Sequence, residues 1–237
     1  MSSLEDSIAT PDGKRRYVRG LFSTIADRYD FITGFLSFGR DRHWKAKLID
    51  RAGVAPGARV LDLACGTGDL AFMAASRGGA VVGLDLTTRM IELAKRKPGA
   101  GAIAWLTGDM TSLPIASDRF DVVTTGYGLR NVPDLSRALD EVGRVLVTGG
   151  QLLSLDFNRP DAAWLRGIYL TYLTVVGSSL GWILHRDPDT YRYIPASIRR
   201  YPGARAVADM LRAKGFVDVA YVPVLGGLMA IHVARKK

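Results

Sequence analysis

The chain has 237 residues, 48% of them hydrophobic, which suits one domain with an insertion, or at most two small domains. A chain of this length buries enough surface to need no disulfide or metal for stability. Its single cysteine, Cys65, excludes an intramolecular disulfide framework, as is typical of proteins of the reducing cytoplasm, and we expect no metal site.

Lysine and arginine outnumber aspartate and glutamate by 32 to 23, giving a formal charge of +9. A basic surface of this kind is either simply solvated or attracts an anionic partner, such as a membrane or a nucleic acid. The sequence holds no nucleic-acid-binding motif, so we expect no nucleic acid among its partners. The predicted partner is an anionic membrane surface, and the predicted location is the cytoplasm, peripherally on the inner face of the membrane.

The patterning begins irregularly and then alternates between strands and helices. Residues 1–20 are expected to form a mobile arm, and residues 21–55 to form helices that cap a single domain covering 21–237. Strands are then predicted at 59–64, 80–84, 102–106, 120–125, 151–157, 217–222 and 228–233. Helices are predicted at 70–76, 87–95, 135–146 and 204–214, with an irregular, helical insertion at 160–200 before the last two strands.

Strands that alternate with helices at this spacing indicate βαβ units and a parallel sheet. The predicted fold class is therefore α/β, a doubly wound, mostly parallel, seven-stranded sheet with a helical insertion. Residues 167–184 in that insertion carry no formal charge and are long enough, at the lower limit, to span a membrane. A span there would separate strands that must share one sheet, so we expect instead a pair of buried or lipid-facing amphipathic helices.

A nucleotide-handling loop follows the first strand. Asp62 precedes Gly66-Thr67-Gly68, whose glycines permit backbone angles closed to other residues and let a ligand approach the main chain. Asp85 ends the next strand, where its carboxylate can accept hydrogen bonds from both ribose hydroxyls of a nucleoside. The same residues also fit the dinucleotide pattern G-x-G-x-x-A, so a nicotinamide oxidoreductase is an alternative.

Two acids favour S-adenosylmethionine over a dinucleotide. Asp62 suits the cationic amino-acid end of that cofactor and would repel a pyrophosphate. Asp109, which with Met110 follows the third strand, is placed to accept a hydrogen bond from an adenine amino group. Helix capping or turn formation is the alternative explanation for both acids.

Four stretches give the chain a family resemblance. They are Tyr29-Asp30-Phe31-Ile32-Thr33 with Leu36-Ser37 and His43-Trp44, then Gly128-Leu129-Arg130-Asn131-Val132, then Asp156-Phe157-Asn158-Arg159-Pro160, and finally Tyr191-Arg192-Tyr193-Ile194 with Ser197-Ile198 and Tyr201-Pro202. In this order they resemble the ubiquinone/menaquinone biosynthesis C-methyltransferase family. The resemblance runs from about Phe22 to His232. Gly126 departs from it, since the family often has serine there.

The resemblance implies a class I, Rossmann-like methyltransferase. Such an enzyme uses S-adenosylmethionine to methylate a ring carbon of a prenylated quinol precursor, either of the demethylmenaquinol or of the 2-polyprenyl-6-methoxy-benzoquinol type. The implied cofactor-binding residues are Asp62, Gly66, Thr67, Gly68, Asp85, Asp109, Met110 and Gly126, the last through its backbone. A methyltransferase acting on another small molecule is the closest alternative, followed by a cofactor-binding assembly protein without turnover.

Carbon methylation requires a nucleophilic ring carbon, which ionisation of a quinol hydroxyl provides. Lowering a phenol pKa from ~10 by about 3 units takes roughly 4 kcal/mol of phenolate stabilisation. Arg130 follows the fourth strand beside the expected cofactor and is the predicted catalytic cation, while Asn131 is expected to hold the hydroxyl or a water. A salt bridge between Arg130 and Asp134 is the structural alternative.

Aromatic residues are the expected walls of the substrate pocket. The candidates are Tyr29, His43, Tyr169, Tyr172, Tyr191 and Tyr193, with residues 167–184 lining a channel for the prenyl tail. Core packing explains the tyrosines of that run nearly as well, and His43 beside Trp44 is more typical of a packed, hydrogen-bonded histidine. A homodimer is a further expectation.

Overall fold

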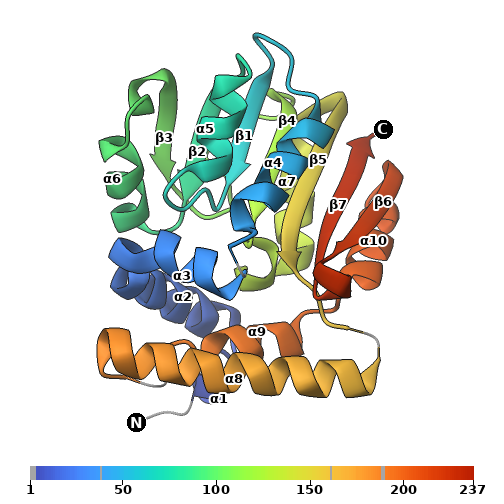
Figure 1. The fold of residues 1–237 in the computed structure, drawn as a ribbon. Coiled ribbons are helices and arrows are strands. Elements are labelled where there is room, and N and C mark those ends of the chain that lie inside the picture. The colour runs from blue at the N-terminus through green and yellow to red at the C-terminus, as the bar shows by residue number, and fades with distance from the viewer. Residues whose placement is uncertain (1–3, 38, 161, 188–189) are drawn as a thin grey trace.

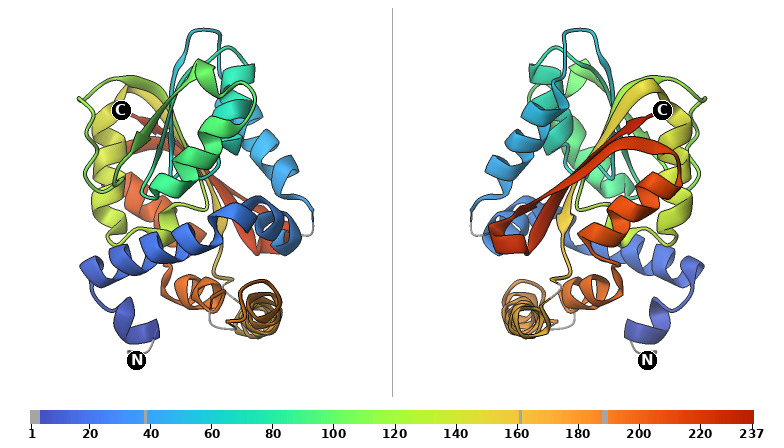
Figure 2. Two further views of the ribbon diagram at one scale, coloured as in Figure 1. Left: turned by 90° about the vertical axis from the view of Figure 1, so that its left-hand side faces the viewer. Right: turned by 90° about the vertical axis from the view of Figure 1, so that its right-hand side faces the viewer.

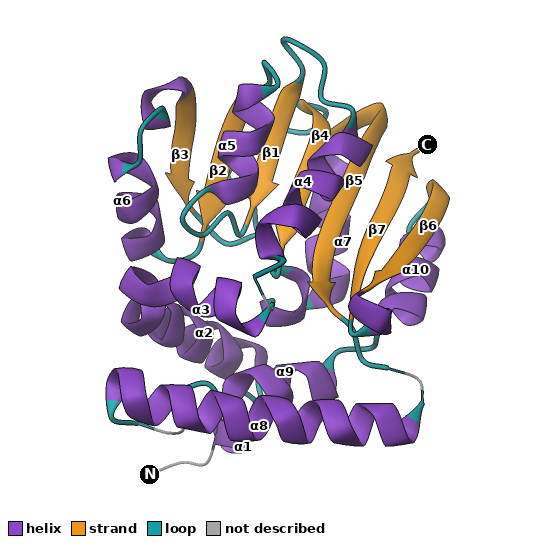
Figure 3. Cartoon of the chain, in the orientation of Figure 1, coloured by secondary structure: helices purple, strands orange, loops and turns teal. Residues whose placement is uncertain are grey.

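A computed structural model describes residues 4–37, 39–160, 162–187 and 190–237. Its centre is a seven-stranded sheet in the order β3-β2-β1-β4-β5-β7-β6 (Figures 1 and 3). The strands are β1 (Arg59–Leu63), β2 (Ala80–Asp85), β3 (Ile103–Thr107), β4 (Phe120–Gly126), β5 (Leu146–Phe157), β6 (Phe216–Val224) and β7 (Met229–Lys236). The first five strands are parallel, whereas β7 runs antiparallel to β5 and to β6. The predicted fold class is confirmed.

Alternate side chains of the central strands enter two separate cores. Val60 and Val122 pack in one hydrophobic cluster, whereas their neighbours Leu61 and Val123 pack in the other. The first cluster lies against α4 (Asp41–Ala52) and α5 (Asp69–Ser76), and the second against α7 (Leu135–Val145) and α10 (Ala204–Ala213). Helix α6 (Thr88–Arg96) connects β2 to β3. The central strands are therefore apolar on both faces, as a doubly wound sheet requires.

The remaining helices gather beyond the carboxyl ends of the parallel strands (Figure 1). They are α1 (Leu4–Ser7), α2 (Pro11–Ile25), α3 (Tyr29–Leu36), α8 (Ala163–His185) and α9 (Tyr193–Arg200). Both turned views show α8 at the end of the molecule farthest from the sheet (Figure 2). Since the strand order reverses between β1 and β4, the ligand crevice of an α/β sheet is expected under this helical layer.

Two expectations for the ends of this layer need correction. Residues 4–20, expected as an arm, are mostly helical, and Ile8 and Val18 are buried in a cluster with Tyr193. The threonine Thr10 accepts a hydrogen bond from Gly13 N, which caps α2, and Pro11 begins the helix. The uncharged run 167–184, expected as a helix pair, lies within the single 23-residue helix α8.

Among the described residues, α8 is the one helix long and apolar enough to cross a membrane, with a mean hydropathy of 1.4 over 18 residues. The strands on either side of it in sequence, β5 and then β6 and β7, are neighbours in one sheet. Tyr169, Leu170 and Leu173 of α8 pack in the first core cluster. Helix α8 is thus held along the protein by one of its faces.

Candidate functional site

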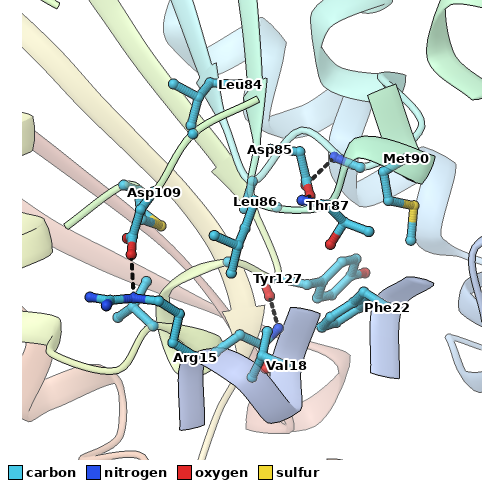
Figure 4. Close-up of a pocket in the computed structure, with 18 of the residues that line it drawn as sticks. Arg15, Val18, Phe22, Leu84, Asp85, Leu86, Thr87, Met90, Asp109 and Tyr127 are labelled. Atoms are coloured by element: carbon cyan, nitrogen blue, oxygen red, sulfur yellow. Dashed lines mark hydrogen bonds and ion pairs between the residues drawn. The ribbon is translucent and has the colours of Figure 1, made fainter. Parts of the chain in front are cut away.

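Three cavities meet at the carboxyl edge of the sheet. The main cavity has a volume of about 640 Å³ and opens to solvent. It is lined by Arg15, Val18, Phe22, Tyr29, Ala64, Gly66, Leu84, Asp85, Leu86, Thr87, Met90, Gly108, Asp109, Met110, Gly126, Tyr127, Gly128, Asn131, Val132 and Pro133 (Figure 4). These residues come from the tips of β1, β2 and β4, from the loop after β3, and from α2, which lies across the opening. The position and size are typical of a nucleoside-binding site in this kind of sheet.

Asp85 is locked in place at the tip of β2. Its two carboxylate oxygens accept hydrogen bonds from Gly66 N at 2.9 Å and from Thr87 N at 2.8 Å. Burial raises the pKa of Asp85, and these backbone hydrogen bonds oppose that rise. The glycine loop and the acid after the next strand are therefore one unit, and the carboxylate keeps lone pairs for ribose hydroxyls in the main cavity.

Asp109 also lines the main cavity, but it already has partners. One oxygen accepts hydrogen bonds from Thr111 N and Thr111 Oγ1, while the other forms a 2.7 Å ion pair with Arg15 Nε (Figure 4). Arg15 belongs to α2, so this ion pair ties the helix over the opening to the loop expected to contact adenine. Sequence reasoning missed the residues that α2 contributes, because basic residues in an apparent arm gave no signal of a wall.

The small cavity adjoins the main one and is more polar. It has a volume of about 280 Å³ and is lined by Tyr29, Lys45, Asp62, Ala64, Cys65, Thr67, Asp69, Leu70 and Gly126. Asp62 accepts hydrogen bonds from Ala71 N at 3.1 Å and Thr124 Oγ1 at 2.9 Å. Lys45, also missed from sequence, is nearly buried and pairs with Asp41 and Asp69 at 2.7 and 2.9 Å. Acids and a lysine together suit a zwitterion, such as the amino-acid end of S-adenosylmethionine.

Burial raises the pKa of Asp62 to about 7, although hydrogen bonds from Thr124 and Ala71 oppose the rise. The carboxyl is therefore mostly protonated below pH 7 and mostly ionised above it. If its charge holds the cofactor's cationic amino group, affinity for S-adenosylmethionine should rise about tenfold between pH 6 and 8. Calorimetry across that range measures this, and Asp62→Asn should remove the dependence. A slope that persists in the variant would contradict the assignment.

The apolar cavity lies on the far side of Tyr29 and has a volume of about 500 Å³. It is lined by Leu21, Phe22, Ile25, Tyr29, Ile32, Thr33, Leu36, Tyr127, Arg130, Phe157, Thr190, Tyr191, Tyr193 and Ile194. Phe22, Tyr29 and Tyr127 line both this cavity and the main one, and Tyr29 lines the small one as well. A ligand of each large cavity would therefore approach the other at these three rings.

The backbone is strained where the cavities meet. Ala64 and Tyr127 adopt left-handed φ values of 50° and 62°, which are unfavourable for residues with a side chain. Tyr127 is held there by a 2.7 Å hydrogen bond from its hydroxyl to Asp41 Oδ1. At neighbouring Gly126 a side chain would come within 3.1 Å of Leu70 Cδ1, so backbone alone faces the cavities.

Arg130 is buried, and its partner is not the one expected. Its Nη1 lies 2.5 Å from Asp156 Oδ1, and its backbone N–H donates to Asp156 Oδ2 at 3.1 Å. Asp134 instead caps α7 by accepting a hydrogen bond from Arg137 N. The guanidinium stacks on Phe157 at 4.6 Å. The salt bridge to Asp134 considered from sequence is therefore wrong, and Asp156 is a site residue that the sequence gave no role.

Polar atoms at Arg130 and Asn131 are left open for a ligand. Among the described residues, Arg130 Nε, Asn131 Oδ1 and the Tyr193 hydroxyl are buried without a hydrogen-bond partner. Lys14 Nζ donates to Arg130 O at 2.9 Å, and burial together with the nearby Arg130 and Arg200 lowers the pKa of Lys14 to about 8. Cations thus outnumber the single acid Asp156 here, and an anion would be stabilised.

The predicted pocket residues divide into two groups. Tyr29, Tyr191 and Tyr193 line the apolar cavity. His43 is exposed and packs edge-on against Trp44, while Tyr169 is buried in the core with its hydroxyl donating to Leu228 O, and Tyr172 packs against that core. None of these three lines any of the three cavities described. The packing alternatives for His43, Tyr169 and Tyr172 are the ones the structure supports.

The predicted cofactor residues divide between the two polar cavities. Gly66, Asp85, Asp109 and Met110 line the main cavity, Asp62 and Thr67 the small one, and Gly126 both. Gly68 lines neither; it begins α5 with φ of 92°, and a side chain there would come within 2.5 Å of the Trp105 ring. Its contribution is therefore to the shape of the loop.

Replacing Asp85 with alanine is expected to weaken S-adenosylmethionine binding at least tenfold, about 1.4 kcal/mol. Two ribose hydroxyls would lose their acceptor, and Gly66 N would lose its carboxylate partner. Calorimetry measures the affinity, and the melting temperature without cofactor serves as a control for folding. Unchanged affinity would contradict the placement of the ribose.

Comparisons with known proteins agree with this geometry. The model of the ubiE/COQ5 methyltransferase family matches residues 10–236. A ubiquinone/menaquinone biosynthesis C-methyltransferase UbiE from Francisella philomiragia is 37% identical over 231 residues, covering 94% of this chain and 92% of that protein. A demethylmenaquinone methyltransferase from Beutenbergia cavernae is 39% identical over 219 residues, covering 92% and 90%.

A solved structure from Thermotoga maritima shows the same fold. It is described as a SAM-dependent methyltransferase and possible histamine N-methyltransferase, with a TM-score of 0.66 and 18% identity, covering 93% of this chain and all of that one. The family match excludes the alternative of a nicotinamide oxidoreductase. With a cofactor cavity of the expected composition and a family model that matches nearly its whole length, the chain belongs to the ubiE/COQ5 methyltransferase family and is an S-adenosylmethionine-dependent C-methyltransferase.

Proposed function

We propose that this enzyme methylates a ring carbon of a prenylated quinol whose ring lies beside Arg130 and whose tail occupies the apolar cavity. The observation that carries the proposal is the junction of the two large cavities at Phe22, Tyr29 and Tyr127, with Arg130 in the wall of the apolar one. One lining is polar enough for a nucleoside and the other is apolar enough for an isoprenoid. The relatives named for quinone biosynthesis support the same acceptor class.

The residues at the junction have complementary tasks. The bound cofactor supplies an electrophilic methyl group on its sulfonium. Arg130, with an open Nε and surrounding positive charge, stabilises the quinolate oxygen, while the open Asn131 Oδ1 accepts a hydrogen bond from the hydroxyl or from a water that takes its proton. The cation stabilises charge and does not act as a base, because the pKa of Arg130 lies above its ordinary, already high value.

The two quinol types differ in the ring that the site must accept. Purified protein with S-adenosylmethionine and a short-tailed demethylnaphthoquinol, or a short-tailed methoxy-benzoquinol, provides the test. Mass spectrometry should show a gain of one methyl group on a ring carbon of at least one of them. Methylation of neither, with the cofactor bound, would favour a different small-molecule acceptor or a protein without turnover.

A further inference from the structure

The outer face of the helical layer is apolar. Among the described residues, seven of the ten large hydrophobic side chains that are strongly exposed lie on α8 and α3. We call these seven the docking face: Phe31, Phe35, Trp164, Ile168, Val175, Trp182 and Ile183, with exposed fractions of 50% to 70%. Such a concentration is unusual on a monomer in water and marks a surface that something covers.

Helix α8 has two distinct apolar sides. Its inner side, with Leu173, Gly177 and Leu180, packs on the protein, and at Gly177 a side chain would come within 3.2 Å of Tyr191 Cβ. Its outer side runs from Trp164 to Trp182, about 27 Å at 1.5 Å per residue. No formal charge occurs between Arg166 and His185. A helix held by one face to a protein, with the other apolar, suits a position in the plane of a membrane interface.

Aromatic and charged residues at the helix ends favour a bilayer as the occupant. Trp164 and Trp182 stand near opposite ends of the outer side, and tryptophan is enriched where a membrane meets water. Arg186 lies 5.8 Å from the Trp182 ring, and Arg28 donates to Leu184 O at the same end. Residues 159–200 carry six arginines against three aspartates and no glutamate. This basic margin complements anionic lipid headgroups.

The docking face is continuous with the apolar cavity. Ile25, Ile32, Leu36 and Tyr191, which line that cavity, share one hydrophobic cluster with Leu180 of α8. Val176 and Leu184 of α8 pack against the same cluster. The contact between α3 and α8 therefore joins the outer surface to a cavity whose wall includes Arg130.

We propose that the docking face lies in the headgroup region of an anionic bilayer and that a lipid tail passes between α3 and α8 into the apolar cavity. The inference rests on the proposed function for the identity of the tail, but the docking itself is independent of turnover.

Vesicle flotation tests the docking directly. The probe is a set of phosphatidylcholine vesicles with or without phosphatidylglycerol, and the variant is Ile168→Glu with Val175→Glu. The matched control is Val217→Glu with Tyr221→Glu, two exposed apolar residues of β6, outside the docking face. Wild type and control should float with the anionic vesicles, and the variant should lose binding about tenfold or more, because charges replace membrane-inserted side chains. About 0.5 M salt should weaken wild-type binding by screening.

Activity and mass measurements separate this proposal from others. The variant should methylate a short-tailed, water-soluble acceptor at the wild-type rate and lose most turnover on a long-tailed acceptor in vesicles. Flotation as expected without methylation of any quinol would leave the docking face standing and refute the proposed substrate. Wild-type protein that does not float, or a variant that floats equally well, would overturn the docking. A wild-type dimer that becomes a monomer in the variant, without vesicle binding, would assign the face to a second copy.

Discussion

Replacing Arg130 with alanine is expected to lower turnover of the quinol about 100-fold or more, the scale seen when one preorganised donor is removed from a site of charge development. The wild-type rate should rise with pH as the quinol ionises. Without the cation, the apparent pKa of this rise should move upward, because the quinolate loses its stabilisation. Rates across pH, normalised to the cofactor-binding stoichiometry, provide the measurement.

The buried ion pair complicates this variant and defines its controls. Asp156 would remain buried without its partner, so Arg130→Ala should also melt at a lower temperature. Arg130→Lys keeps a positive charge near Asp156 but lacks the planar fork, and it should recover only part of the turnover. Arg144→Ala breaks an ion pair with Glu141, outside the cavities described, and should leave both rate and pH profile unchanged. An unmoved pH profile with full specific activity in Arg130→Ala would refute the catalytic role.

The parts of the fold that the sequence could predict depend on local chemistry. Gly66 and Gly68 adopt φ values of 54° and 92° that favour glycine, so their spacing after an apolar strand indicated the loop. The central strands are buried on both faces, and their continuous apolar runs indicated a parallel sheet. Asp85 was placed correctly at the cavity because the end of a strand fixes its side chain at the sheet edge.

The parts that could not be predicted depend on packing between distant segments. Arg130 and Asp156 are 26 residues apart and meet because β4 and β5 are neighbours, whereas Asp134 is nearer in sequence but caps a helix. Helix α2 lines the main cavity through Arg15, although its basic, exposed composition resembles an arm. Tyr169 and Tyr191 belong to the same aromatic insertion, but only Tyr191 turns toward the apolar cavity.

Replacing Asp156 with asparagine is expected to cost about 3–5 kcal/mol of unfolding free energy, because it leaves a buried arginine without its counter-charge. Asp156 is 2% exposed, and it also accepts a hydrogen bond from Phe157 N at 2.8 Å. Burial alone would lower the pKa of Arg130, and Asp156 more than offsets that effect. For a domain of this size the melting temperature should fall on the order of 10 °C. Chemical denaturation monitored by fluorescence measures the free energy.

The same variant distinguishes a positioning role for Asp156 from a purely structural one. Its carboxylate opposes the formation of a second anion beside Arg130, so its removal should lower the apparent pKa of the quinol in the pH–rate profile. This shift is opposite in direction to that of Arg130→Ala. Replacing both members with apolar residues, Arg130→Met with Asp156→Leu, should restore much of the stability but none of the turnover. Equal shifts in the two single variants, or an active double variant, would show that the pair serves folding alone.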